Sequence, residues 1–279
     1  MGFEGIYIRG GDTAVILGRQ KTGCFKRGHS FIQFVSRDLP WYGEFPYKDY
    51  KSWLFGVRLG ALDINDDRVR CKLQLGPFTP IRGCAMGPLC LVPGLECRHF
   101  VLSMRNTVKG RLSVGDREIH FENRHGYVEG DRGSGFPKKY FWAQCGEFTD
   151  PNLDEKLSIM ASVAVIPYLG VKHTGTLCII NFCGKEFRLA SYRGAKVKTF
   201  EKNRIVVTQG RGKKRLTLEV EGQNPGTQIP VKAPIKGQMS RSINESLAAE
   251  MRFKLTRGAD LVFDCGTKNG AYETGGLGE

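Results

Sequence analysis

The segment that decides the fold prediction runs from His125 to Phe148 and reads H-G-Y-V-E-G-D-R-G-S-G-F-P-K-K-Y-F-W-A-Q-C-G-E-F. In its first part Tyr127, Glu129 and Asp131 stand at every second position. An extended strand would project all three side chains to the same face, because successive side chains of a strand point to opposite sides. The pattern therefore predicts a strand with two carboxylates and a phenol side by side.

The residues after Pro137 show the same alternation with a different chemistry. Tyr140, Trp142 and Gln144 would share one face of a second strand. Glycines within Gly130–Gly135 permit sharp or left-handed backbone conformations, and Pro137 blocks an earlier helix start. We expect two strands joined by an irregular glycine loop, with carboxylates on one wall and aromatic rings on the other.

Strand-like runs separated by turn residues fill most of the remaining chain. They cover 3–9, 13–17, 29–35, 53–57, 68–75, 95–104, 110–114, 117–121, 158–166, 175–182, 186–190, 195–200, 204–208, 216–220, 252–256 and 260–264. One short helix is predicted near 242–251: Ser242 to Glu245 form a capping box, and Ile243, Leu247 and Met251 make an apolar stripe. Residues 40–60 are predicted as an aromatic loop that leads into the strand at 53–57, and the residues after 264 as a loose glycine-rich tail.

Length and composition are those of an ordinary globular protein. The chain has 279 residues, of which 41% are hydrophobic and 25% charged. Many strands with one helix predict an all-β, mostly antiparallel fold. A boundary near 148–156 would divide it into an N-terminal lobe, 1–150, that carries the signature stretch, and a C-terminal lobe, 151–279. We find no apolar run long enough to span a bilayer and no signal peptide, so a cytoplasmic location is expected.

The charge balance is strongly basic, with 42 Lys and Arg against 28 Asp and Glu, a net charge of +14. Such a charge favours anionic partners. The densest cluster, Arg211–Arg215, reads as a charged hairpin tip without any nucleic-acid-binding motif beside it. We therefore expect a basic surface that is exposed to solvent. This surface leaves open a peripheral contact with a membrane, and binding of nucleic acid is not expected.

The nine cysteines lack paired CxxC spacing. Their odd number indicates reduced thiols, and without a Cys/His cluster at ligand spacing no metal is expected. No strand–GxGxxG–helix unit or Walker loop occurs, so no redox cofactor or nucleotide is expected either.

The central segment also resembles the signature of the tocopherol cyclase family. The similarity is strongest from Gly126 to Pro137 and from Tyr140 to Cys145, and it extends to Phe3–Arg9, Glu96–His99 and Leu261–Thr267. The sequence departs from the signature where Arg132 and Ile6 replace tryptophans and Gly146 replaces an asparagine. The resemblance implies a lipocalin-like double barrel of two β-barrel or sandwich lobes.

The resemblance also implies a cofactor-free cyclisation, in which an acid protonates an alkene and a phenol oxygen captures the cation. Burial can keep a carboxylic acid protonated, and aromatic faces stabilise a cation. The candidate catalytic residues are Glu129, Asp131, Arg132, Glu96 and His99. The candidate substrate-binding residues are Tyr127, Phe136, Tyr140, Trp142, Gln144 and Tyr7.

Each candidate also has a purely structural interpretation. Aromatic rings are often core residues. Taken by itself, His99 is typical of a strand histidine whose ring nitrogens make hydrogen bonds within the fold. Glu96 and His99, three apart, fall on opposite faces of a regular strand. If Arg132 faces the pocket, it opposes a carbocation about 4 Å away by about 4 kcal/mol at an effective dielectric near 20. If Arg132 pairs with Asp131, Glu129 is the better proton donor.

The favoured function is a cofactor-independent isomerase or cyclase that closes a ring on a prenylated or polyphenolic aromatic substrate. The alternative is a non-catalytic, lipocalin-like carrier of an apolar or anionic small ligand. A basic nucleic-acid or membrane-surface binder is the third candidate, and only the net charge favours it.

Overall fold

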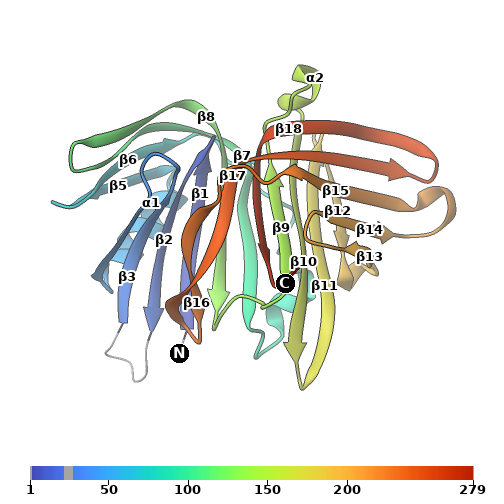
Figure 1. Ribbon diagram of the computed structural model, residues 1–279, viewed down its shortest axis with the longest axis horizontal. Coiled ribbons are helices and arrows are strands. Elements are labelled where there is room, and N and C mark those ends of the chain that lie inside the picture. The colour runs from blue at the N-terminus through green and yellow to red at the C-terminus, as the bar shows by residue number, and fades with distance from the viewer. Residues whose placement is uncertain (1, 22–27, 279) are drawn as a thin grey trace. The chain divides into compact units, whose positions relative to one another are not determined.

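The computed structural model describes residues 2–21 and 28–278, and these are mostly antiparallel β-strand (Figure 1). In the described residues one sheet has eight strands in the order β4-β3-β2-β1-β8-β7-β6-β5. Their bounds are β1 Gly2–Gly10, β2 Thr13–Lys21, β3 Gly28–Val35, β4 Trp41–Pro46, β5 Ala61–Asn65, β6 Arg70–Leu75, β7 Cys97–Val114 and β8 Arg117–Gly133. The all-β, antiparallel prediction is confirmed.

The second sheet has ten described strands, nine in the order β12-β11-β10-β9-β18-β17-β15-β14-β13, with β16 paired to β17. Their bounds are β9 Tyr140–Cys145, β10 Leu157–Tyr168, β11 Val171–Phe182, β12 Lys185–Ala190, β13 Lys196–Phe200, β14 Arg204–Gln209, β15 Leu216–Asn224, β16 Ile229–Ile235, β17 Gln238–Arg257 and β18 Asp260–Gly275. The helical elements within residues 2–21 and 28–278 are α1 Asp49–Arg58, α2 Pro151–Asp154 and three 3₁₀ turns at Gly87–Leu91, Ser191–Arg193 and Gly212–Lys214.

The chain forms two compact units that are interleaved in sequence. The first comprises Met1–Ile81, Cys97–Phe136 and Ile229–Ile243, and the second comprises Arg82–Glu96, Pro137–Gln228 and Asn244–Glu279. The boundary predicted near 148–156 lies inside the second unit. Strand β17 contributes its first residues to one unit and the rest to the other.

Two faces of the eight-stranded sheet differ in chemistry. Ile6, Ile8 and Val128 belong to the apolar core of the first unit. Tyr7 and Glu129 alternate with these residues on β1 and β8, so they project from the opposite face. That non-core face carries the candidate site.

A hairpin of the first unit covers part of the non-core face. Gln33, which alternates with core residues of β3, accepts a hydrogen bond from the backbone N–H of Lys232 at 2.8 Å and donates to its carbonyl at 3.4 Å. Gln20 accepts from the N–H of Met239 at 2.7 Å, and Gly237 N–H donates to the carbonyl of Ser134. The β16–β17 hairpin is thereby fixed to β2, to β3 and to the end of β8.

The helix predicted near 242–251 is wrong, because these residues lie in β17. Every second side chain from Ile243 to Leu255 is buried, including the charged Glu245. A spacing of four residues, as from Ile243 through Leu247 to Met251, satisfies a strand period of two as well as a helix period. The ten-stranded sheet resolves this ambiguity, since β17 pairs there with β15 and β18.

Three further sequence predictions are wrong. Residues 41–46, at the start of the predicted aromatic loop, form strand β4 and pair with β3. Residues 53–57, predicted as a strand, lie in helix α1, which buries Tyr50, Trp53 and Val57 at helical spacing. The predicted loose tail is part of β18 as far as Gly275, and Tyr272 is buried in the core of the second unit. The hairpin predicted at residues 3–17 and the strands predicted between 158 and 220 are confirmed.

The described cysteines are free thiols, whereas Cys24 lies outside the described residues. In the described part of the chain no helix has both the length and the apolar character needed to cross a bilayer.

Candidate functional site

The candidate site is built where β1, β8 and β7 lie side by side in the first unit. Tyr7 of β1 and Val101 of β7 flank Glu129 of β8, and His99 of β7 stands opposite Asp131. This register places the imidazole next to both carboxylates, which are two residues apart on one strand face. The pairing of β7 with β8 thus brings His99 to the two acidic side chains that the alternation along β8 places on one face.

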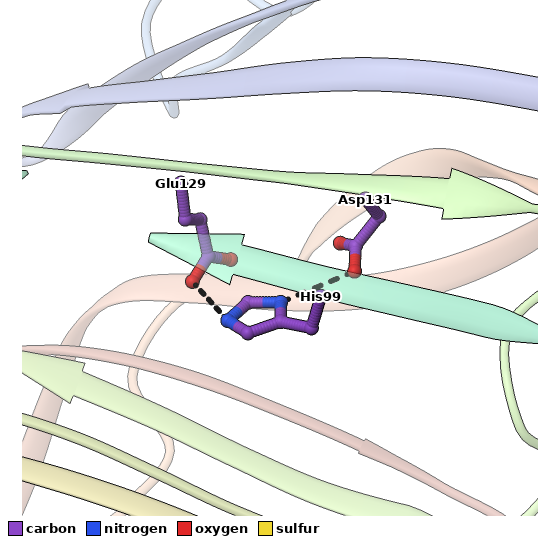
Figure 2. A group of neighbouring side chains, drawn as sticks. All are labelled: His99, Glu129 and Asp131. Carbon is purple, nitrogen blue, oxygen red and sulfur yellow. Dashed lines mark hydrogen bonds and ion pairs between the residues drawn. The ribbon is translucent and has the colours of Figure 1, made fainter. Parts of the chain in front are cut away.

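The side chains form a continuous chain of polar contacts. Tyr127 donates its hydroxyl proton to Glu129 Oε2 at 2.5 Å. The Nε2 atom of His99 lies 3.3 Å from the same oxygen, and its Nδ1 atom lies 3.1 Å from Oδ1 of Asp131. The Cys97 thiol donates to Asp131 Oδ1 at 3.2 Å. Figure 2 shows both carboxylates pointing from β8 toward the ring of His99.

Burial gives this cluster its electrostatic character. The Glu129 side chain is 8% exposed, whereas His99 and Asp131 retain 17% and 21%. Burial opposes the charge on His99, but attraction by Glu129 and Asp131 outweighs it and raises its pKa well above the ordinary value. Burial, and then the negative charge of Glu129, also raise the pKa of Tyr127. The surroundings therefore favour the protonated form of His99, which lies between Glu129 and Asp131.

The structure brings together five of the predicted site residues: Tyr7, Tyr127, Glu129, Asp131 and His99. The predicted common face of the three β8 residues is confirmed by their contacts.

Arg132 and Glu96 lie outside this cluster. Arg132 is exposed, and alternation along β8 directs it away from the face that carries Asp131. The guanidinium is therefore not positioned to oppose a cation beside the cluster. Glu96 is half-buried in the bend before β7 and belongs to the second unit.

The predicted aromatic wall lies on β9, in the other sheet and the second unit. Its alternation is confirmed, because Phe141, Ala143 and Cys145 enter the core of that unit. On the other face of β9, Tyr140 donates a hydrogen bond to Glu273. The carboxylate strand and the aromatic strand are not paired as one hairpin, since β9 pairs with β10 and β18.

The remaining three predicted substrate-binding residues differ in their surroundings. Trp142 is half-buried on β9, where it stands opposite Glu273 of β18. Phe136 of the first unit packs edge-to-face on Phe3, with ring centroids 5.5 Å apart. Gln144, on the non-core face of β9, is 2% exposed.

Cys97 is the cluster residue that the sequence analysis missed as a site residue. Its position two before His99 on the same predicted strand was the available signal. The thiol adds a donor to Asp131 at the more exposed end of the cluster.

One imidazole and two carboxylates also form a donor set for a divalent metal ion, and their ligand atoms lie within 4.8 Å of one another. However, the two ring nitrogens of His99 face different carboxylates, and the raised pKa of His99 favours a bound proton there. The arrangement fits a proton-holding site better than a metal centre.

Fold and site together define an antiparallel β protein of two units with a buried carboxylate–imidazole cluster on a non-core sheet face. A family model described as tocopherol cyclase-like matches residues 81–276, and the chain belongs to this family. The chloroplastic tocopherol cyclase of Zea mays is 23% identical over 198 residues, which are 68% of this chain and 41% of that protein. The chain thus spans about two fifths of the length of that relative.

Solved structures share the fold. The crystal structure of CghA with Sch210972 has a TM-score of 0.58 at 10% identity, covering 100% of this chain and 89% of that one. A further crystal structure of CghA has a TM-score of 0.57 at 9% identity, with the same coverage.

Proposed function

We propose that the protein is a cofactor-independent isomerase that closes a ring on a prenylated or polyphenolic aromatic substrate by acid–base catalysis. The observation that carries the proposal is the contact chain from Tyr127 through Glu129 and His99 to Asp131. Membership of the tocopherol cyclase-like family and the name of the maize relative support it.

The two ends of the cluster suit different roles. Glu129 is the inner member, because it is buried, accepts the hydrogen bond of Tyr127 and lies 3.3 Å from His99 Nε2. Asp131 and His99 are more exposed, so we place the substrate at their end. Asp131 would accept a proton from the substrate, and His99 would supply one, with Glu129 restoring the charge balance around the imidazole.

The proposed ring closure needs no oxidant or reductant, because every proton that leaves the substrate is returned to it. A phenol of the substrate loses its proton to Asp131, and its oxygen bonds to one carbon of a polarised double bond. The π electrons of that bond move to the neighbouring carbonyl as an enolate. The proton of His99 then adds to the adjacent carbon, and Asp131 returns a proton to the imidazole. The product is an isomer of the substrate.

The electrostatics favour substrates whose double bond is polarised by a carbonyl group. Two carboxylates stabilise the imidazolium of His99, so it is a weak acid. A weak acid is poorly suited to protonate an isolated alkene, but it can donate to a developing enolate. Phenolic enones are therefore preferred to simple prenylquinols within the proposed substrate class.

The non-catalytic carrier explains the cluster less well. Burying a carboxylate costs free energy even where a partner offsets part of the cost, and here Glu129 is buried with Tyr127 beside the partly buried His99 and Asp131. A carrier of an apolar ligand has no need of such a group. The burial of Glu129 favours the enzyme.

The test is turnover on a panel of prenylquinols, chalcone-like phenols and polyenes, with isobaric products detected by chromatography and mass spectrometry. We expect conversion of at least one phenolic enone, and we expect Glu129→Gln and Asp131→Asn to abolish it while substrate affinity stays within a few-fold. The matched control is Glu118→Gln, which neutralises an exposed carboxylate beside His120 on the same strand. Full turnover in both cluster variants would remove these carboxylates from the mechanism.

A further inference from the structure

Helix α1 of the first unit exposes cations and bulky apolar side chains on one side. Its buried residues, Tyr50, Trp53 and Val57, belong to the core of the unit. On the opposite side of the helix, exposed residues recur with the helical period from the residue before the first turn to the residue after the last. We call this row the α1 outer face, and it consists of Lys48, Lys51, Ser52, Phe55, Arg58 and Leu59.

Two large apolar side chains lie in the middle of the α1 outer face. Phe55 is 64% exposed and Leu59 is 69% exposed. Residues four apart are neighbours on a helix surface, so the two side chains form one continuous apolar patch. A single exposed apolar residue is ordinary, whereas an adjacent pair of this size is typical of an interaction site.

Three cations border this apolar pair. Lys48, Lys51 and Arg58 are exposed, and in the described part of the chain none of them forms an ion pair with a carboxylate. The acid of the helix, Asp49, is half-buried in the first turn, outside this row. The exposed acid of the adjoining strand β5, Asp63, stands opposite a lysine of β6. The α1 outer face is therefore positive and favours a negatively charged partner.

The position of α1 is fixed by contacts on its buried side. Ser30 of β3 accepts a hydrogen bond from the backbone N–H of Tyr50 at 3.3 Å and donates to the carbonyl of Tyr47 at 3.0 Å. The ring of Trp53 packs edge-to-face on Phe45 of β4, with ring centroids 5.4 Å apart. The outer face is thus pre-formed, and a partner can bind without first ordering the helix.

The dimensions and charge of the α1 outer face favour a lipid surface over a protein. The helix has 10 residues and is about 15 Å long, whereas a specific protein interface takes about 800 Å² from each partner. A second copy of the chain would bring the same cations together, and these would repel one another. A bilayer needs no complementary groove, because apolar side chains enter its acyl boundary while lysine and arginine keep their charged ends at the level of the phosphates.

We propose that the α1 outer face docks the protein on an anionic membrane surface, with its apolar pair inserted between the lipid headgroups and its three cations against the lipid phosphates. The contact is peripheral, because two apolar side chains reach only the outer part of one leaflet. None of the His99 cluster residues belongs to this face, so the proposal does not depend on the function proposed for that cluster.

The test is sedimentation of the full chain with sucrose-loaded vesicles, made of phosphatidylcholine alone or with about 30% phosphatidylserine. We expect binding to the anionic vesicles, at least tenfold weaker binding to the neutral ones, and loss of binding as salt is added. Phe55→Ser and Leu59→Ser should each weaken the binding about tenfold. The double variant Lys51→Gln, Arg58→Gln should weaken it by about twenty-fivefold, because each cation near such a surface contributes roughly fivefold.

Each kind of variant has a matched control elsewhere in the chain. Leu261→Ser replaces a leucine of β18 that is 60% exposed and follows Asp260. The double variant Lys109→Gln, Arg111→Gln removes two exposed cations from β7 of the first unit. Both controls should bind anionic vesicles nearly as the wild type does. Circular dichroism and a thermal melt verify that every variant is folded.

A second readout shows which side chain enters the bilayer. The tryptophan of Phe55→Trp should be quenched by lipids with brominated acyl chains and that of Leu261→Trp should not, each measured against the three tryptophans of the wild type. No preference for anionic vesicles, equal binding of the wild type and the α1 variants, or equal quenching of the two introduced tryptophans would each overturn the proposal. Binding to a DNA oligonucleotide without binding to vesicles would also overturn it, and would assign the cations to nucleic acid instead.

Discussion

The ionisation of His99 gives the sharpest test of the cluster. Replacing Glu129 with Gln keeps the size of the side chain and an oxygen that can accept the Tyr127 hydrogen bond, but it removes one charge. At the observed 3.3 Å between His99 Nε2 and Glu129 Oε2, an effective dielectric near 20 gives an attraction of about 5 kcal/mol. That attraction is one of two that outweigh the burial of His99, so the pKa of His99 must fall in the variant.

The assay is an NMR titration of histidine-labelled protein, in which the His99 signal is assigned by its loss in His99→Gln. In the wild type the signal should stay in the protonated form well above the ordinary titration range of histidine, near pH 6.5. In Glu129→Gln the ring should lose its proton at a clearly lower pH.

The control pair lies on the same strand. Glu118 and His120 approach to 2.6 Å, but the His120 side chain is 64% exposed, so solvent screens the attraction. This exposed pair lies outside the His99 cluster, so Glu118→Gln should leave the titration of His99 unchanged. A wild-type His99 that titrates at or below the ordinary range, or one that does not respond to Glu129→Gln, would refute this reasoning.

Four further predictions rest on the burial and contacts of single side chains. Tyr127→Phe should lower the free energy of unfolding by about 1–3 kcal/mol in urea titrations, because Glu129 loses a buried hydrogen bond. Arg132→Gln should leave turnover and thermal stability close to wild type in parallel assays, since the side chain is exposed away from the cluster. Phe253→Ala should cost about 3–5 kcal/mol by chemical denaturation, because the ring is fully buried in β17. The stabilisation by protonated His99 should be fully present below the unfolded-state pKa of this residue, and it should decline as the pH rises through the raised folded-state pKa. The difference in melting temperature between wild type and His99→Gln should therefore narrow at alkaline pH.

Part of the candidate site could be predicted from the sequence, because the alternation of side chains along one strand depends only on neighbouring residues. Alternation placed Tyr127, Glu129 and Asp131 on one face, and their contacts confirm this. The approach of His99 depends on the register between β7 and β8, which shifts at three places between Val101 and Gly110. Such irregularities leave no reliable signal in a single sequence, so the bridging position of the imidazole was not predictable.

The fold errors have a similar physical origin. A spacing of four residues between apolar side chains fits both a helix and a strand. The capping-box sequence from Ser242 to Glu245 favoured the helix in the prediction. The extent of β17 is decided by pairing with β15 and β18, which are distant in sequence. The same holds for the interleaved units, since Ile229–Ile243 joins the first unit by contacts with residues about 200 positions earlier, such as Gln33 with Lys232.

The measurement that tests the central proposal most directly is product formation in D₂O, starting from the panel member that the protein converts. If the cluster delivers a proton to carbon, mass spectrometry will find one solvent-derived deuterium bound to carbon in the product, and Glu129→Gln will form none of this product above the uncatalysed background. A product without carbon-bound deuterium, or the same labelled product at the wild-type rate from Glu129→Gln, would contradict proton delivery by this cluster.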